Sequence, residues 1–331
     1  MEEPLALMRL GQPVDEGRAL PHVVQGIAVR AAVPPVAAPP AAASMTTGLL
    51  ANSFAAGSIT GIRIRVHPLL PATTLLYSLG YVLTYGTVGF ALGLLVFGPL
   101  LWSTVLFHEL WHCWAAKRLG IRVDEILLWP LGGLAFIGQS PTPCADISVA
   151  AAGPASHLPQ ALLWIGLLAA ANGGSLADLA VDPRSNFGGA VCYLTLLLNA
   201  SMALFNLCLP CYPLDGGRIL ADALLARGLS PTRAAGVLVR ISALVALGLL
   251  AYAAFLLVEQ AGTGQASVPA HALVLCALVA WMGAQTYSLH ALQRDGRAHM
   301  HPLFASAAGA APRADEAPAM IRADAAVTQR I

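Results

Sequence analysis

The residues best suited to chemistry stand together in the segment His108-Glu109-Leu110-Trp111-His112. On a helix, positions four residues apart lie on one face, so His108 and His112 can bind the same metal ion. Glu109, on the adjoining face, can reach a water molecule at that ion, and the whole pattern is typical of zinc-dependent hydrolases. The spacing therefore predicts a helical metal site with Glu109 as its general base.

A third ligand is needed, because catalytic zinc commonly has three protein ligands and one open position, and two histidines with one carboxylate are an established set. Most acidic residues of the central part of the chain lie in loops or at the ends of apolar segments. Asp215 instead follows Pro210 and Pro213, which should end a helix, and precedes Gly216 and Gly217, which should permit a tight turn. We therefore expect Asp215 to complete the metal site.

The composition is that of a protein in contact with a lipid bilayer. Of the 331 residues, 57% are hydrophobic and 11% are charged, whereas an ordinary soluble domain has about 25% charged residues. The formal net charge of +1 gives no indication of a nucleic-acid partner. Six scattered cysteines do not suggest the disulfide framework of a secreted domain. An integral, multi-pass membrane protein is predicted.

Six apolar runs of roughly 18 or more residues are long enough to span a bilayer. They cover approximately 66–85, 88–116, 146–171, 187–209, 236–258 and 268–290. The predicted fold class is an all-α membrane protein, a polytopic bundle of about six transmembrane helices. The expected domains are a disordered Ala/Pro-rich region at 1–57, the membrane domain at 58–295 and a disordered tail at 296–331.

Loop charges orient this bundle. Most of the basic residues lie on one side of the bundle, which holds the N-terminal flank, the loops after the second and fourth spans and the C-terminal flank. The three loops of the other side contain one basic residue, Arg184. The positive-inside rule then places both termini in the cytosol or in an equivalent stroma or matrix. A bacterial inner membrane and a plastid membrane fit equally well. Because His112 lies close to Lys117 and Asp215 close to Arg218, both parts of the metal site are expected at one depth.

Two segments resemble the signatures of the site-2 protease family of intramembrane metalloproteases, namely Phe107-His-Glu-Leu-Trp-His112 and Leu214-Asp-Gly-Gly-Arg218. The similarity extends to Pro130-Leu-Gly-Gly133 and Ala152-Gly-Pro154 and covers about residues 58–290. The chain looks closest to the compact six-span branch without a PDZ domain. The resemblance implies one zinc ion per chain, a catalytic core made of spans two to four, and hydrolysis of peptide bonds in or near the transmembrane segment of a protein substrate.

The resemblance also suggests how a substrate binds. Members often carry an asparagine three residues before the first proline of the aspartate motif, whereas Asn206 stands four residues before Pro210, so both substrate contact and contact between helices remain open for it. Gly132 and Gly133 could present a strand edge that pairs with an unwound substrate segment. Many six-span members end in a nucleotide-sensing CBS pair, which the short tail here does not contain, so a regulatory membrane partner is possible.

Two functions other than proteolysis are compatible with the sequence. The same scaffold could serve a non-catalytic membrane binder or chaperone, and a transporter using buried acids is more distant. The intact set of His108, Glu109, His112 and Asp215 favours the enzyme, because a binder has no need of Glu109 in register with two ligands. His67 and His157 lack a partner at metal-ligand spacing, so they are expected to pack between helices and not to bind metal.

Overall fold

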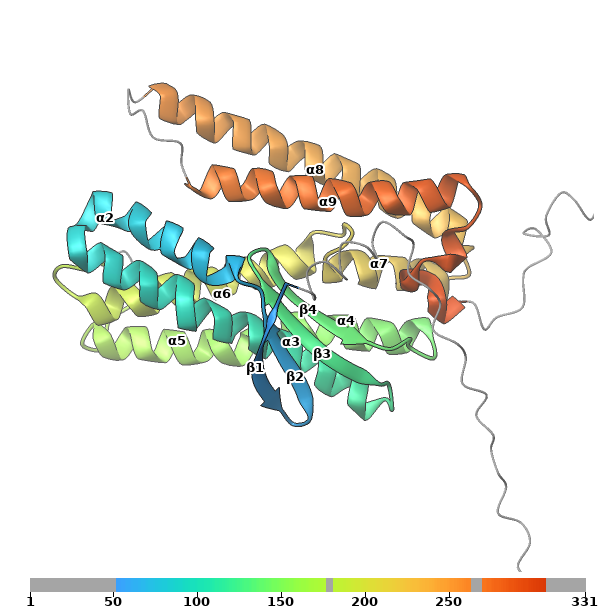
Figure 1. Cartoon of the computed structure of the whole chain (residues 1–331), viewed down its shortest axis with the longest axis horizontal. Helices are drawn as coiled ribbons and strands as arrows, with labels where there is room; N and C mark the ends of the chain where they lie inside the picture. Colours follow the sequence, from blue (N-terminus) through green and yellow to red (C-terminus); the bar gives the residue numbers. More distant parts are fainter. Residues whose placement is uncertain (1–51, 177–180, 263–269, 308–331) are drawn as a thin grey trace, which may run out of the picture. The chain divides into compact units, whose positions relative to one another are not determined.

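The computed structural model describes residues 52–176, 181–262 and 270–307 (Figure 1). The helices are α2 (Leu69–Leu95), α3 (Leu101–Arg118), α4 (Pro143–Ala155), α5 (His157–Ala171), α6 (Phe187–Cys208), α7 (Asp215–Ala226), α8 (Pro231–Gly262) and α9 (Ala270–Arg294). The strands are β1 (Phe54–Ile59), β2 (Ile62–Val66), β3 (Val123–Trp129) and β4 (Gly132–Ile137). A π-helical turn, η1 (Val96–Leu100), joins α2 to α3, and two 3-10 helices, η2 (Ala298–Met300) and η3 (Pro302–Ala307), follow α9.

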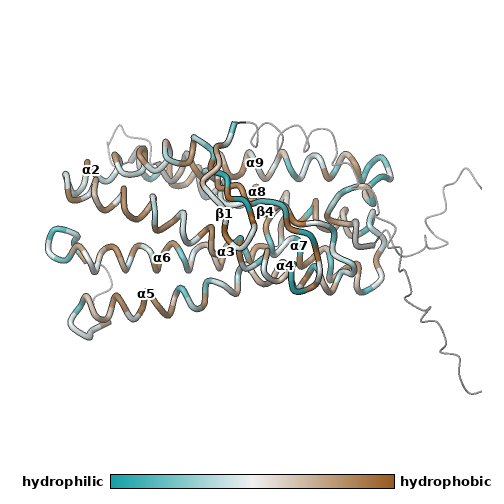
Figure 2. Tube along the Cα trace, turned by 60° about the horizontal axis from the view of Figure 1, so that its bottom comes forward, coloured by the Kyte–Doolittle hydropathy of each residue, from teal (hydrophilic) through white to brown (hydrophobic). Residues whose placement is uncertain are grey.

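The expectation of a mostly helical membrane protein is confirmed. In the described part of the chain, three helical stretches are long and apolar enough to cross a membrane, namely Leu69–Arg118, Phe187–Cys208 and Pro231–Glu259. Many of their large apolar side chains face outward, among them Leu83, which is 83% exposed, and Leu244, which is 69% exposed. Figure 2 shows hydrophobic residues along the length of α5 and α6 as well. So many exposed apolar side chains are suited to lipid and not to water.

The first of these stretches is a helical hairpin. At Gly86 the backbone has φ 65° and ψ −145°, a left-handed conformation that favours glycine, and here α2 folds back on itself. The hydroxyl of Thr74 donates to the carbonyl of Phe97 at 2.9 Å. A Cβ atom on Gly93 would lie only 2.7 Å from the Cα atom of Ser78. These pairs lie on either side of Gly86, so the first two expected spans are two antiparallel helices (Figure 1).

The third expected span, 146–171, consists of two helices. α4 has 13 residues and α5 has 15, and they meet at Ser156, just after Pro154, which has no N–H group for helical hydrogen bonding. Neither helix alone reaches the roughly 18 residues that a membrane span needs. The sixth expected span begins at residue 268, outside the described residues, and α9 is described from Ala270 onward.

A four-stranded sheet corrects the expectation of an all-α protein. Its strand order is β1-β2-β3-β4, with β2 and β3 parallel and the other neighbours antiparallel. The expectation of a strand edge at Gly132 and Gly133 fits β4, whereas β1, β2 and β3 (Val123–Trp129) were not predicted, because such short runs show no clear period. The strand β4 lies at an edge of the sheet and beside α3, which is the helix that carries the histidine motif.

The C-terminal boundary of the ordered domain extends beyond residue 295. Leu303 and Phe304 pack into a buried cluster with side chains of α7, α8 and α9, and Phe304 is completely buried. At the other end, β1 begins at Phe54, inside the region 1–57 that was expected to be disordered. Most of the two expected disordered regions lies outside the described residues.

Candidate metal centre

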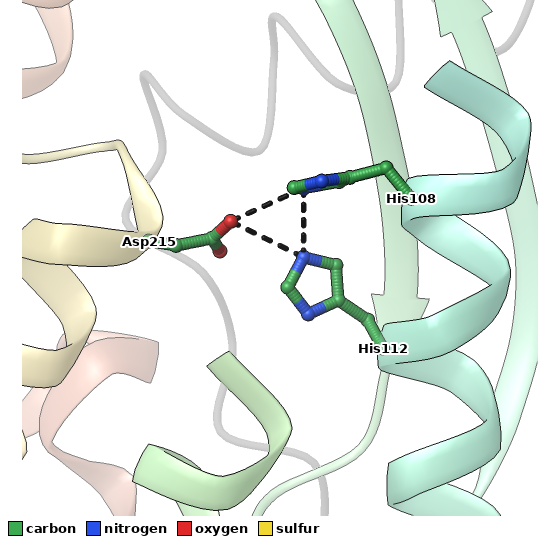
Figure 3. Close-up of side chains that lie close together, drawn as sticks. All are labelled: His108, His112 and Asp215. Atoms are coloured by element: carbon green, nitrogen blue, oxygen red, sulfur yellow. Dashed lines mark hydrogen bonds and ion pairs between the residues drawn. The ribbon is translucent and has the colours of Figure 1, made fainter. Parts of the chain in front are cut away.

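Helices α3 and α7 bring three polar side chains to one point, as Figure 3 shows. The Nε2 atoms of His108 and His112 lie 3.1 Å apart. One carboxylate oxygen of Asp215 lies 3.2 Å from Nε2 of His108 and 3.3 Å from Nε2 of His112. All three side chains are buried. Among the described residues, these three side chains form a group that could hold a metal ion.

This triangle fits a tetrahedral zinc ion. Bonds of about 2.0–2.1 Å to nitrogen and oxygen ligands place two ligands of a tetrahedral site about 3.3–3.4 Å apart. The three edges of 3.1, 3.2 and 3.3 Å are close to that spacing. Two nitrogens and one carboxylate oxygen also make an established donor set for catalytic zinc. The residues present therefore suit the ion in both chemistry and spacing.

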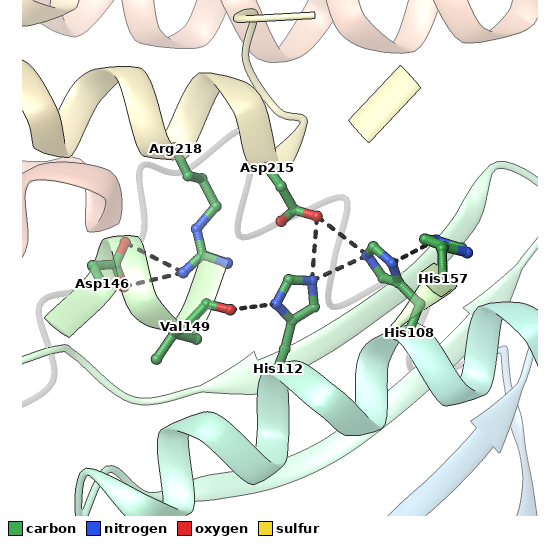
Figure 4. A network of polar contacts seen from close by, with 7 residues as sticks. All are labelled: His108, His112, Asp146, Val149, His157, Asp215 and Arg218. Atoms are coloured by element: carbon green, nitrogen blue, oxygen red, sulfur yellow. Dashed lines mark hydrogen bonds and ion pairs between the residues drawn. The ribbon is translucent and has the colours of Figure 1, made fainter. Parts of the chain in front are cut away.

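Helix α4 fixes one ligand through its backbone. Nδ1 of His112 lies 2.7 Å from the carbonyl oxygen of Val149, which can only accept a hydrogen bond (Figure 4). The proton of the neutral imidazole is therefore on Nδ1, and the lone pair on Nε2 faces Asp215 and His108. A tautomer held in this way is a common feature of metal-binding histidines.

Close packing of glycines lets the helices approach the site. A Cβ atom on Gly153 of α4 would overlap Nε2 of His112 and would lie 2.7 Å from Nε2 of His108. Gly216 and Gly217 are helical residues at the start of α7, and a Cβ atom on Gly216 would lie 2.6 Å from the carbonyl oxygen of Leu209. The expected role of these two glycines in a tight turn is thus corrected: they allow α7 to start against the backbone of the preceding loop.

All the site residues that were predicted from the sequence line one cavity of about 630 Å³. The residues in question are His108, Glu109, His112, Gly132, Gly133, Asn206 and Asp215. Glu109 is buried, and a Cβ atom on Gly133 would overlap its side chain, so the glycine leaves space for the carboxylate. Leu278 and Trp281 of α9 line the cavity as well. The structure thus brings together the residues for which chemistry and substrate contact were predicted.

A partly buried ion pair joins α7 to α4. The guanidinium of Arg218 donates to Asp146 at 3.1 Å (Figure 4). The hydroxyl of Ser140 donates to the same carboxylate at 2.6 Å. Burial alone would lower the pKa of Arg218, but the nearby carboxylates, first of all that of Asp146, raise it above its ordinary value. Because Arg218 is one helical turn after Asp215, this pair helps to position the Asp215 carboxylate.

Two polar residues behind His108, namely His157 and Asn199, were not recognised in the sequence as part of the site. His157 lies outside the ligand triangle, but its Nε2 is 3.0 Å from Nδ1 of His108, and its Nδ1 is 3.1 Å from Oδ1 of Asn199. His67 is buried elsewhere and does not line the cavity. A histidine inside an apolar span is by itself a signal of a functional site, and this signal could have identified His157.

The comparisons with known proteins agree with this geometry. Residues 96–191 match the model of peptidase family M50, a segment that contains His108, Glu109 and His112 but ends before Asp215. A candidate zinc metalloprotease of Synechocystis sp. is 36% identical over 177 residues, which are 51% of this chain and 43% of that protein. A zinc metalloprotease of Methanocaldococcus jannaschii is 36% identical over 121 residues, which are 37% of this chain and 32% of that protein. The chain thus spans less than half the length of these relatives.

Among solved structures, the site-2 protease from Methanocaldococcus jannaschii is 24% identical, with a TM-score of 0.46, over 71% of this chain and 95% of that one. The apolar helices and the buried His-His-Asp triangle define an integral membrane protein with a site for a metal ion. Within that class, the segment that carries the histidine motif is similar to peptidase family M50.

Proposed function

We propose that this protein is an intramembrane zinc endopeptidase that hydrolyses peptide bonds in or near the transmembrane segments of protein substrates. One observation carries the proposal: three potential zinc ligands and Glu109 line one cavity inside an apolar helix bundle. The zinc metalloproteases among the relatives support the same activity. His108, His112 and Asp215 would hold one zinc ion per chain.

The chemistry divides between the ion and Glu109. Zinc at this site would polarise the scissile carbonyl and lower the pKa of water toward about 7. Glu109 accepts the proton of the attacking water and passes it to the leaving amine, which is general base and then general acid catalysis. Gly133 has no side chain that would displace the carboxylate of Glu109 from this position.

The edge strand β4 is suited to hold the substrate. A helical substrate must unwind before its amides are accessible, and an unwound segment can pair with an exposed strand edge. Gly132, Gly133 and Ala135 of β4 all line the cavity. Asn206, on the opposite helix α6, lines the cavity as well. Its amide can donate a hydrogen bond to the unwound substrate segment or accept one from it.

Strand pairing predicts a period of two in cross-linking. With Ala135→Cys in the protease, single cysteines along the cleaved segment of a reporter should form disulfides at alternate positions, because successive strand residues point to opposite faces. The protein with alanine at position 135 provides the background from the native cysteines. Cross-links of equal yield at consecutive positions would contradict strand pairing, and a period near four would indicate a helical substrate.

The proposed topology has six spans, the third made of α4 and α5 together, with both termini on the cytosolic side or its equivalent. Lys117 donates to the carbonyl of Thr60 at 2.8 Å, so basic residues of the first flank and of the second loop share one end. Arg184 lies at the other end, where its guanidinium is 5.6 Å from the ring centroid of Tyr85, next to the turn at Gly86. Labelling of single cysteines from either side of the membrane tests this orientation. Fractionation of the membranes of the source cell tests the expectation of a bacterial inner or plastid membrane.

The decisive experiment measures zinc content and cleavage together. The purified protein in detergent should contain about one zinc ion per chain and should cleave some members of a panel of single-span reporters. Chelation should abolish cleavage, and added zinc should restore it. Zinc binding without cleavage of any reporter would favour the alternative, a non-catalytic binder or chaperone, or the need for a regulatory membrane partner.

A further inference from the structure

A chain of buried hydrogen bonds leads away from the metal site on the side opposite Asp215. Nδ1 of His108 on α3 lies 3.0 Å from Nε2 of His157 on α5 (Figure 4). Nδ1 of His157 lies 3.1 Å from the amide oxygen of Asn199 on α6. The exposed fractions of the three residues are 4%, 2% and 0%. Three helices therefore contribute one residue each to a polar chain that ends at a proposed zinc ligand.

The direction of these hydrogen bonds decides whether His108 can bind metal. A neutral imidazole carries one N–H and one lone pair, and an amide oxygen can only accept. If Asn199 accepts from Nδ1 of His157, then Nε2 of His157 accepts from Nδ1 of His108. Nε2 of His108 is then free of a proton and faces His112 and Asp215. If both hydrogen bonds ran in the opposite direction, Nε2 of His108 would carry a proton and could not bind an ion.

The far end of the chain does not itself fix this direction. Nδ2 of Asn199 has no hydrogen-bond partner among the residues that the structure describes. If the amide were turned around, its oxygen would stand in the same surroundings. The two ligand histidines thus differ, because His112 is held by the backbone carbonyl of Val149, whereas the tautomer of His108 depends on the orientation of a side-chain amide.

We propose that His157 and Asn199 are positioning residues that set the tautomer of His108, and that metal binding and the orientation of the Asn199 amide are coupled. The proposal rests on the zinc site proposed above. Partners behind a ligand histidine orient the ring and set the protonated nitrogen, and their loss typically weakens metal binding by about 10- to 100-fold.

Two substitutions of similar size at position 199 separate this role from packing. Asn199→Asp provides oxygens that can only accept, which fixes the productive direction, so zinc should bind as tightly as in the wild type or more tightly. Asn199→Leu removes the acceptor, and zinc affinity should fall about tenfold. A packing role predicts the opposite order, because leucine suits an apolar interior and a buried carboxylate does not. The readout is the zinc dissociation constant, measured by competition with a chelator of known affinity.

A second pair at position 157 tests the other link. The amide oxygen of His157→Gln can accept from Nδ1 of His108, so this variant should keep most of the zinc affinity, whereas His157→Leu should lose about tenfold. This pair also decides the matter if Asn199→Leu does not fold. If the wild type bound zinc and all four variants bound it with the same affinity, the relay would be wrong and the proposed zinc site would stand. A wild-type protein that binds no zinc would overturn the proposed function and the relay with it.

Discussion

Replacement of Glu109 by glutamine is expected to abolish cleavage of reporter substrates while zinc content stays at the wild-type level. Glutamine has nearly the same shape as glutamate but cannot accept the proton of the attacking water. Loss of a general base typically costs about 10²- to 10⁴-fold in rate, and here one residue serves both proton transfers. Initial rates on one reporter and the ratio of zinc to protein, measured on the same samples, provide the check.

Glu259→Gln is the matched control for this variant. Glu259 is an exposed residue near the end of α8 and does not line the cavity, so the same change of charge there should leave the rate unaltered. If Glu109→Gln retained the full rate, Glu109 would not be the base and the proposed protease mechanism would be wrong. Loss of zinc together with the rate would instead show that Glu109 supports the ligands.

Gly153→Ala is expected to lower zinc affinity about 100-fold, although it adds a single methyl group. The new Cβ atom would overlap Nε2 of His112 and lie 2.7 Å from Nε2 of His108, so it disturbs two ligands at once. Overpacking of a close-packed interior costs about 1–3 kcal/mol, and about 1.4 kcal/mol corresponds to a tenfold change in binding. The zinc dissociation constant is the quantity to measure, and cleavage should fall with zinc occupancy.

The matched control for this change is Gly166→Ala on the neighbouring helix α5. No heavy atom lies within 4 Å of a Cβ atom placed on Gly166, and alanine is a better helix former than glycine by about 1 kcal/mol. This variant should fold at least as well as the wild type and keep its zinc affinity. Normal zinc binding by Gly153→Ala would mean that α4 can move away from the ligands, contrary to the packing described above.

The sequence by itself determined the parts of this protein that depend on local spacing. His108 and His112 share a helix face because four residues separate them, and Glu109 follows from its place between them. The break at Pro210 and Pro213 identified Asp215, which the structure places with the two histidines. Long apolar runs are a local property as well, so the membrane class and the hairpin around Gly86 could be predicted from the order of residues alone.

Tertiary structure decided which groups hold these residues in place. The pairing of β2 with β3 joins segments that the hairpin separates in the sequence, so no local period indicated this pairing. The carbonyl of Val149 behind His112 and the pair His157 and Asn199 behind His108 come from three other helices. Gly153 is required because two backbones approach closely at the ligands. Such contacts depend on distances between helices, and these are set only when the whole chain packs.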